Sequence, residues 1–450
     1  MSASFEAKFE DRASRYDTRK LDPKRRINIC TSRVALLTYP GQVQFLVAAN
    51  LLARTHANVN LQPVDGSVPI DPRLPFAGKD IFDHALQDMR AVRERHQFTS
   101  SGPQAGDLLF NVDPKSSGYV IHGDGWNSWI GLGPSPLRAE NETNPFGPAL
   151  AVILAVAQVY LGDGNQPYVP IEANAFDWTL GFTSEKVLPT LPVGTKIWFN
   201  GLGSVGTATL YFLSLFTRRA FTTLVDADMV KVENISRSPL FTAQHASAHT
   251  PKVDVAAQFM ADAGFPAPAV HKAMLDELKE WMNRDTGTPD LVVSAANERN
   301  VQYWTEVGHP PLQIYATTGK TFQVTLLRHI PVKEACSLCL FPLGEQVNPQ
   351  TCAMDEEAAS LGVVLGEEPV DPALPFLSFL AGMMSASEIG KVSLQGYPFT
   401  RNRVYVALNP TFRCVHSNIR KLEDCLCQRD TNKHSLAIEG SKFAGLSWIY

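Results

Sequence analysis

Three closely spaced glycines are the residues of this sequence that first predict chemistry. Gly201, Gly203 and Gly206 lie between two apolar runs within residues 196–216, a pattern typical of a strand, a tight turn and a helix. Small residues at such a turn let the backbone approach a phosphate group at the N-terminus of the helix. This type of loop binds dinucleotides as well as ATP. The sequence lacks the P-loop motif, so an ATP site here belongs to another class.

Polar residues further along the chain distinguish the two kinds of nucleotide. Asp226 and Asp228 end the next apolar run and predict a contact with the ribose of either one, and the usual register favours Asp226. Asn234, Arg237 and Lys252 then add a neutral polar group and two cations. Fixed cations stabilise the charge on a triphosphate attacked at its α-phosphorus, whereas backbone N–H groups normally suffice for the pyrophosphate of a dinucleotide. The pattern therefore favours ATP over a nicotinamide cofactor, and an adenylating enzyme over an oxidoreductase.

Two close pairs of cysteines late in the chain predict a metal site. They have C-x-x-C and C-x-C spacings and are Cys336 with Cys339 and Cys425 with Cys427. Four thiolates suit a tetrahedral Zn²⁺, which would attach the C-terminal segment to the second half of the chain. An alternative ligand that could close the site is Cys414 or His416, a short way upstream of the second pair.

Alternating apolar runs indicate the elements that must position these residues. Strand-like and helix-like runs alternate through the second half, which predicts an α/β fold with a doubly wound parallel sheet. Residues 162–192 are rich in Pro, Gly and Asn and predict a boundary between two domains, 1–180 and 181–450. The first domain repeats the strand, turn and helix at residues 32–55, but its turn, 38–41, has no glycine loop. We interpret the chain as a duplication in which the first copy has decayed.

Composition argues against several classes of function. The chain has 450 residues and a net charge of −5 at pH 7, without the basic surface that nucleic acid requires. It contains no apolar run of about 18 residues, the minimum for a membrane span. The polar N-terminus is unlike a secretory signal, and seven cysteines without such a signal favour metal binding or catalysis over disulfides. We therefore expect a cytoplasmic enzyme that binds neither nucleic acid nor membranes.

The order of these motifs resembles that of the ThiF-like family, the adenylating enzymes that activate ubiquitin and related small proteins. The segments FNGLGSVGT, VDADMVKVENISR and TPKVDVA match its glycine loop, ribose acid, Asn-x-x-Arg and lysine. ACSLCLFP resembles its first zinc pair, TCAMDEEAASLG its crossover-loop cysteine region, and DCLC its second zinc pair. The chain is too short for the cysteine-domain insertion of the eukaryotic enzymes. It most resembles the compact activating enzymes of bacterial antiphage ubiquitin-like conjugation operons.

The resemblance implies two Rossmann-like adenylation domains that form a pseudo-dimer, the first inactive and the second with the zinc site. It implies ATP, Mg²⁺ and Zn²⁺ as cofactors. The implied partners are a ubiquitin-like protein with a C-terminal glycine and a conjugating enzyme. The carboxylate of the ubiquitin-like protein would attack the α-phosphate of ATP, and Arg237, Lys252 and Arg19 would stabilise the transition state. Arg19 lies in SRYDTRK, which resembles the segment whose arginine reaches the partner domain's ATP site.

Transfer of the adenylated carboxyl group needs a nucleophile, and Cys352 is our candidate. It lies in a polar loop, where an exposed thiolate could attack the acyl-adenylate and form a thioester, with AMP as the leaving group. Cys425 or Cys427 is the alternative if either is not a zinc ligand. Cys30 is expected to be a small buried residue.

The sequence departs from the family where magnesium would bind. The family usually has D-x-x-D-N in the strand after the lysine, but here the stretch is VVSAANERN. Ala296 replaces the expected acid, and only Asn297 is retained. Asp228 is an alternative metal ligand. Two rival interpretations remain: a sulfur-carrier adenylyltransferase, which needs no acceptor cysteine, and an inactive scaffold, which would follow if the missing acid is decisive.

Overall fold

The computed structural model describes residues 3–14, 25–76, 78, 80–93, 98–137, 140, 143–162, 169–278, 289–296, 298–308, 310–331, 333–341, 373–392, 394, 401–409 and 412–428. No helix in these ranges is long and apolar enough to cross a membrane.

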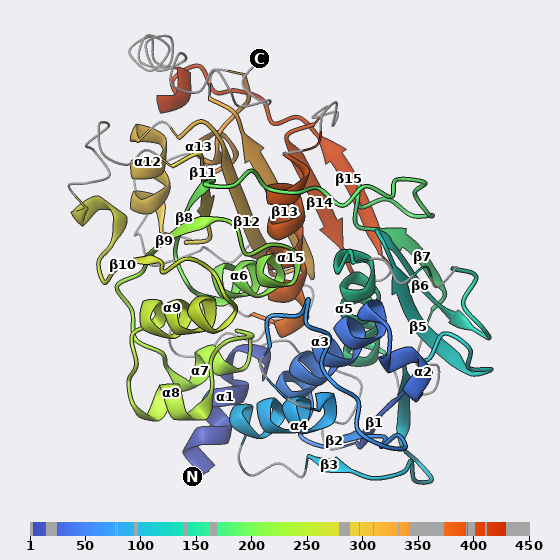
Figure 1. The fold of residues 1–450 in the computed structure, drawn as a ribbon. Coiled ribbons are helices and arrows are strands. Elements are labelled where there is room, and N and C mark those ends of the chain that lie inside the picture. Colours follow the sequence, from blue (N-terminus) through green and yellow to red (C-terminus); the bar gives the residue numbers. More distant parts are fainter. Residues whose placement is uncertain are drawn as a thin grey trace.

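The second half of the chain is built on an eight-stranded sheet (Figure 1). Its order is β10-β9-β8-β11-β12-β13-β14-β15: the strands as far as β12 are parallel, and β13 to β15 are antiparallel. The bounds are β8 (Lys196–Asn200), β9 (Phe221–Val225), β10 (Ala269–His271), β11 (Leu291–Ser294), β12 (Gln313–Gly319), β13 (Gln323–His329), β14 (Arg403–Ala407) and β15 (Arg413–Ser417). This confirms the predicted α/β fold with a parallel sheet.

Helices cover both faces of the parallel part. The helical segments are α6 (Ser204–Phe216), α7 (Val232–Ile235), α8 (Ala243–Ser247), α9 (Lys252–Asp262), η1 (Leu275–Glu277), α12 (Arg299–Val307), α13 (Ser337–Leu340), α15 (Pro375–Lys391) and η2 (Leu426–Gln428). The main core packs α6 and α15 against one face, and a smaller cluster with Trp198, Val292 and Val301 packs α12 against the other. Because β8 and β11 are covered on both sides, all their residues except Lys196 are buried and most are apolar.

The first half contains a smaller parallel sheet and a three-stranded antiparallel meander. The parallel sheet has the order β3-β2-β1-β4, and the meander has the order β5-β6-β7. The strands are β1 (Ile27–Cys30), β2 (Val59–Leu61), β3 (Thr99–Ser100), β4 (Leu108–Asn111), β5 (Tyr119–Asp124), β6 (Asn127–Leu132) and β7 (Ile171–Asn174). The helices are α1 (Ala3–Ser14), α2 (Arg33–Leu36), α3 (Tyr39–Thr55), α4 (Ile81–Val92) and α5 (Phe146–Leu161).

The main strands and the long apolar helix follow one another in the same order in the two halves. In each parallel sheet the first strand lies between the second and the fourth, with the third at the edge. In each half an antiparallel hairpin follows, then a long apolar helix, then another antiparallel strand. That helix is α5 in the first half and α15 in the second. The sequence showed this correspondence only for the first strand, turn and helix.

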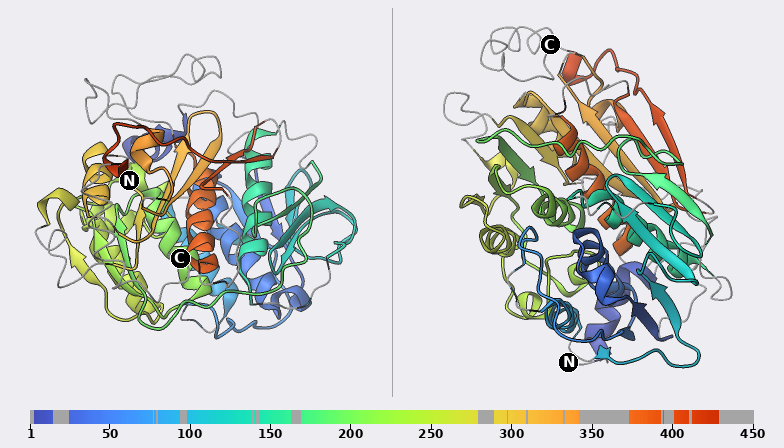
Figure 2. Two further views of the ribbon diagram at one scale, coloured as in Figure 1. Left: turned by 90° about the horizontal axis from the view of Figure 1, so that it is seen from above. Right: turned by 45° about the vertical axis from the view of Figure 1, so that its right-hand side comes forward.

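The halves meet along their longest helices. α3, α5, α6 and α15 lie together in the middle of the molecule (Figures 1 and 2). Ring contacts connect them: Phe146 with Phe216 at 5.8 Å and Tyr160 with Phe376 at 5.4 Å between ring centroids. Almost every residue of α5 and every residue of α15 is buried, because each helix contacts protein on nearly every side.

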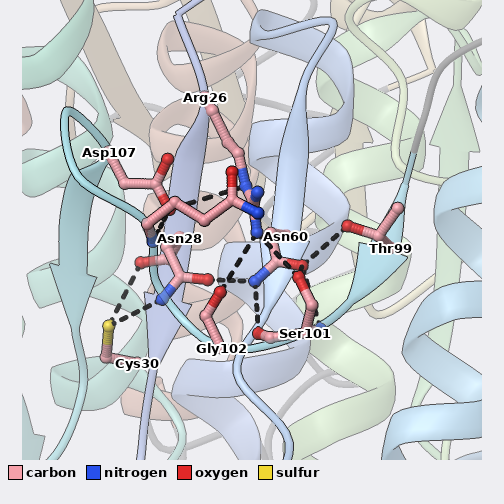
Figure 3. Close-up of polar contacts among 9 residues, drawn as sticks. Arg26, Asn28, Cys30, Asn60, Thr99, Ser101, Gly102 and Asp107 are labelled. Atoms are coloured by element: carbon pink, nitrogen blue, oxygen red, sulfur yellow. Dashed lines mark hydrogen bonds and ion pairs between the residues drawn. The ribbon is translucent and has the colours of Figure 1, made fainter.

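One face of the first parallel sheet carries a polar network instead of an apolar layer (Figure 3). The side chains of Asn28 and Asn60 are fully buried and hydrogen-bonded to each other. Asn60 Oδ1 accepts from Thr99 Oγ1 at 2.7 Å and Ser101 Oγ at 2.9 Å. Cys30, expected to be buried, is partly buried beside Asn28, and burial raises the pKa of its thiol. A raised pKa reduces the fraction of thiolate at neutral pH, in keeping with the structural role expected of Cys30.

A candidate nucleotide site and a four-cysteine cluster

The glycines between β8 and α6 have two different physical roles. Gly201 has a φ of +90°, and a Cβ on Gly206 would lie 2.1 Å from the carbonyl oxygen of Gly201. Both positions therefore require glycine for the turn itself. A Cβ on Gly203 would meet no atom within 4 Å. Gly203 is the N-cap of α6, and no described side chain caps this helix, so the first turn of α6 opens into free space.

In the first half, the turn that corresponds to the glycine loop is residues 38–41, and the backbone of α2 packs closely against it. The short helix α2 precedes α3, and a Cβ on Gly41 would lie 2.1 Å from the carbonyl oxygen of Ala35. Thr38 is the N-cap of α3, and its Oγ1 accepts from the N–H of Gly41 at 3.1 Å. A backbone group that would face a phosphate in the second half is thus satisfied internally in the first.

Asp226 and Asp228 follow β9 and lie in different environments. Asp226 is buried and accepts from the N–H of Leu202 at 2.6 Å and the N–H of Asp228 at 2.8 Å. Burial raises the pKa of Asp226, while Lys252 and the two backbone donors act in the opposite direction. The side chain of Asp228 is 64% exposed, and its carboxylate lies 2.6 Å from Nζ of Lys252.

Lys252 is the first residue of α9 and is only 7% exposed. A cation at a helix N-terminus is unfavourable, and two carboxylates offset it: Nζ lies 2.6 Å from Asp228 and 3.8 Å from Asp226. Lys252 also lines the cavity that the glycine turn borders, and its role there stays a prediction.

Asn234 and Arg237 are held by the segment around α7. The side chain of Asn234 accepts from the N–H of Lys231 at 2.9 Å. The backbone beyond Arg237 is held from the first half: Arg54 on α3 donates to the carbonyl oxygens of Ser238 at 2.7 Å and of Pro239 at 3.0 Å. Arg54 is 3% exposed, and burial lowers its pKa to about 9. The sequence contained no local signal for this contact because its partners are far apart in the chain.

These groups line one cavity of about 680 Å³. The predicted residues among its walls are Gly201, Gly203, Asp226, Asp228, Asn234, Arg237 and Lys252. Further walls, which the sequence did not indicate, come from residues 273–275, from Glu298 and Gln302 near α12, and from Arg403 and Tyr405 on β14. The guanidinium of Arg403 lies 5.4 Å from the ring centroid of Tyr405. Only the folded sheet brings these residues beside the glycine loop.

Three predicted site residues lie outside the described residues: Arg19, Asn297 and Cys352. Ala296 is described, lines the cavity and is 8% exposed. It lies against the glycine turn, because a Cβ on Gly201 would approach the backbone nitrogen of Ala296 to 2.8 Å.

The four paired cysteines come together as predicted. The sulfur atoms of Cys336, Cys339, Cys425 and Cys427 all lie within 4.8 Å of one another. Three sulfur pairs are separated by 3.4, 3.5 and 3.9 Å. A tetrahedral Zn²⁺ with Zn–S bonds of about 2.3 Å would separate its sulfur ligands by roughly 3.8 Å, so the donor set and spacing fit zinc. Hydrogen bonding to Cys336 lowers the pKa of Cys427 to about 6.

The alternative zinc ligands lie elsewhere. Cys414 and His416 are on β15, in positions that pair with Val406 and Val404 of β14. Neither belongs to the cysteine cluster. Burial raises the pKa of Cys414 to about 12.

The chain belongs to the ThiF family, whose sequence model matches residues 194–428. Among solved structures, it is similar to Escherichia coli MccB with MccA-N7isoASN, at 15% identity and a TM-score of 0.39, over 52% of this chain and 67% of that one. It is also similar to PaaA, at 16% identity and a TM-score of 0.37, over 50% and 73% of the two chains. No curated protein matches the chain. The structural matches are distant, so the family assignment rests on the sequence model and on the site described above.

Proposed function

We propose that this protein activates the C-terminus of a ubiquitin-like protein by ATP-dependent adenylation and then carries it as a thioester. The observation that supports the nucleotide step is the cavity itself. There the open first turn of α6 faces the same space as Lys252, Arg237 and the carboxylates of Asp226 and Asp228. Membership of the ThiF family supports adenylation of a carboxyl group.

In the proposed reaction, the loop from Gly201 to Gly206 binds the phosphates and Asp226 binds the ribose. A carboxylate oxygen of the ubiquitin-like protein attacks the α-phosphorus, and pyrophosphate leaves. Lys252, Arg237 and, from the first half, Arg19 stabilise the negative charge of the transition state. Mg²⁺, when bound, would neutralise charge on the triphosphate, and Asn297, which lies outside the described residues, is a candidate to help hold it. Cys352 then attacks the acyl carbonyl, AMP leaves, and the resulting thioester passes to a conjugating enzyme.

We further propose that residues 1–180 are an inactive adenylation domain and residues 181–450 an active one, joined as a pseudo-dimer. The shared order of elements supports this interpretation, as does the internal cap on α3. α1 packs on α7, so the chain that leads to Arg19 begins beside the segment of Asn234. The four cysteines would bind Zn²⁺ and attach η2 to the segment of α13. We expect a cytoplasmic protein of an antiphage conjugation system.

The test uses the full chain with MgATP and the glycine-ended ubiquitin-like protein encoded beside its gene. ATP–pyrophosphate exchange that depends on this carrier, and a reductant-sensitive band on a gel, would support both steps. We expect Lys252→Ala to abolish both signals. Lys272→Ala should retain them, because Lys272 is an exposed lysine just beyond β10 whose ion pair with Asp254 lies outside the cavity lining.

Two cysteine variants test which thiol accepts the adenylated carboxyl group. We expect Cys352→Ala to lose the band and keep pyrophosphate exchange, and Cys30→Ala to keep both. Exchange without any band in the unmodified protein would favour a sulfur-carrier adenylyltransferase. Carrier binding with neither signal would favour an inactive scaffold.

A further inference from the structure

We propose that Glu298 replaces the acid missing at position 296 and binds the divalent cation that accompanies ATP, together with side-chain oxygens of Asn200 and Gln302. This inference rests on the proposed function, because the cation is one that enters with a nucleotide. It assigns a metal ligand that the family pattern does not contain at this position.

The other two acids beside the glycine loop are already engaged. Asp226 accepts two backbone N–H groups at 2.6 and 2.8 Å, which hold the turn between β8 and α6. Asp228 lies 2.6 Å from Nζ of Lys252. These contacts already use part of the acceptor capacity of both carboxylates.

Glu298 is a further carboxylate in the lining of the cavity. It is the N-cap of α12, two residues after Ala296, and it is exposed. The backbone carbonyl oxygen of Glu298 accepts from the N–H of Gln302 at 3.2 Å, whereas its carboxylate makes no hydrogen bond or ion pair with a described residue. β8 and β11 are neighbouring parallel strands in which Asn200 pairs with Ser294, so the loop that leads to Glu298 starts beside the glycine turn.

Two buried oxygen atoms of residues that line the same cavity supply an independent indication of a ligand. Asn200 is 0% exposed and Gln302 is 2% exposed, and both line the cavity. Their amide nitrogens donate within the protein, Asn200 Nδ2 to Thr305 at 3.3 Å and Gln302 Nε2 to Tyr315 at 3.2 Å. Neither Asn200 Oδ1 nor Gln302 Oε1 accepts a hydrogen bond from any described residue. Leaving such buried acceptors unsatisfied is costly, and a bound cation would satisfy them.

The donor set suits Mg²⁺ or Mn²⁺. Both are hard cations that prefer carboxylate and carbonyl oxygens, and Mg²⁺ in nucleotide sites usually uses one or two carboxylates together with the phosphates. Glu298 supplies one carboxylate, and the two amides supply neutral oxygens. Thiols and imidazoles, which would select other metals, are absent from the described lining of this cavity.

The experiment measures Mn²⁺ binding to the full chain by electron paramagnetic resonance, with and without an ATP analogue that has a methylene group between the α- and β-phosphorus atoms. The variant is Glu298→Gln, which keeps the shape of the side chain. Its matched control is Glu233→Gln, because Glu233 is an acid of the same cavity on the α7 side. Analogue affinity in the presence of a chelator is measured for all three proteins by calorimetry.

We expect Glu298→Gln to weaken Mn²⁺ binding in the analogue complex by at least about tenfold. Its affinity for the analogue without metal should equal that of the unmodified protein, and Glu233→Gln should leave both values unchanged. Unchanged Mn²⁺ affinity in Glu298→Gln, or a loss only in Glu233→Gln, would overturn the assignment while nucleotide binding stands. An analogue that binds to none of the proteins would overturn the proposed function and this inference with it.

Discussion

At the scale of single residues, neighbouring residues of the glycine loop and of the acidic segment after β9 have different structural roles. Gly201 and Gly206 are needed so that the turn can close, whereas Gly203 leaves space in front of α6. Asp226 holds the turn through backbone donors, whereas Asp228 pairs with Lys252. Some residues of the motif therefore stabilise the turn and others leave room for a ligand. Mutations at the two kinds of position should change stability and nucleotide affinity separately.

The glycines provide that separation. We expect Gly203→Ala to leave the melting temperature unchanged, because its methyl group meets no atom, and to weaken binding of an ATP analogue by crowding the phosphates. Gly206→Ala should lower the free energy of unfolding by about 1–3 kcal/mol, because its methyl group would lie against the carbonyl of Gly201. Thermal unfolding and calorimetry measure the two effects. Unweakened nucleotide binding in Gly203→Ala would contradict the position given to the phosphates.

At the scale of elements, the cysteine cluster joins segments that are distant in the sequence. Cys336 and Cys339 belong to the segment of α13, and Cys425 and Cys427 to the segment of η2. Among the described residues these form a small apolar cluster of their own, separate from the main core. A metal there would replace the stability that this region does not gain from a large buried surface.

We expect the purified protein to contain one zinc ion per chain, measured by mass spectrometry of the metal. Cys425→Ser should lose it and lower the melting temperature, since a ligand is removed and the C-terminal segment is released. Cys414→Ser is the control, because Cys414 lies on β15 and outside the cluster, and it should keep the zinc. Loss of zinc from Cys414→Ser with retention in Cys425→Ser would instead support the alternative ligand set.

The end of α15 carries a buried ion pair whose effect depends on pH. Nζ of Lys391 lies 2.8 Å from Glu388, and the side chain is fully buried near the rings of Trp126 and Trp178. Burial lowers the pKa of Lys391 below 10.5, and Glu388 opposes this shift. Between the lowered pKa and 10.5 the unfolded chain binds more protons than the folded one, so this pair makes stability rise with pH in that window.

Urea unfolding at several pH values tests this pH dependence of the free energy of unfolding. The double variant Lys391→Met/Glu388→Gln should lose the rise in stability as the pH approaches 10.5. Lys391→Met alone should cost about 3–5 kcal/mol at neutral pH, because it leaves Glu388 buried without a cation. An equal dependence on pH in the double variant and the unmodified protein would show that Lys391 does not titrate as described.

At the scale of the whole molecule, the first half supports the site of the second. Arg54 on α3 donates to the backbone oxygens of Ser238, Pro239 and Phe241, just after Arg237. The hydroxyl group of Ser238 in turn lies 2.7 Å from that of Thr207 on α6. The buried guanidinium of Arg54 thus connects the central helix of the first half to the segment that carries Arg237.

We expect Arg54→Met to lower the free energy of unfolding by about 1–3 kcal/mol, because it leaves buried carbonyl oxygens unsatisfied. It should also weaken binding of an ATP analogue, although Arg54 is not among the residues that line the cavity. Arg33→Met is the control, since the described residues to which the Arg33 guanidinium donates, Asp65 and Ser67, both lie in the first half. If Arg54→Met loses stability but keeps the affinity for the analogue, the contact supports the fold and not the site.

The sequence by itself determined the local parts of this protein. Each of its predicted motifs spans only a few residues: the glycine turn, the acids after β9, the lysine at the start of α9 and the two cysteine pairs. Spacing along the chain therefore predicted their elements and their chemistry. The alternation of apolar runs predicted the α/β class, which the sheet confirms. The sequence also predicted that the two cysteine pairs form one cluster, and the structure brings all four cysteines together.

Only the tertiary structure decided how those parts combine. Parallel neighbours such as β8 and β11 are separated by about ninety residues, and their pairing brings Glu298 and Gln302 to the glycine turn. The contact of Arg54 with Ser238 spans an even longer stretch of chain. Such contacts depend on burial and on the packing of long helices, which leave no local pattern. For that reason the sequence predicted the nucleotide loop, and the fold was needed to find the groups that complete its cavity.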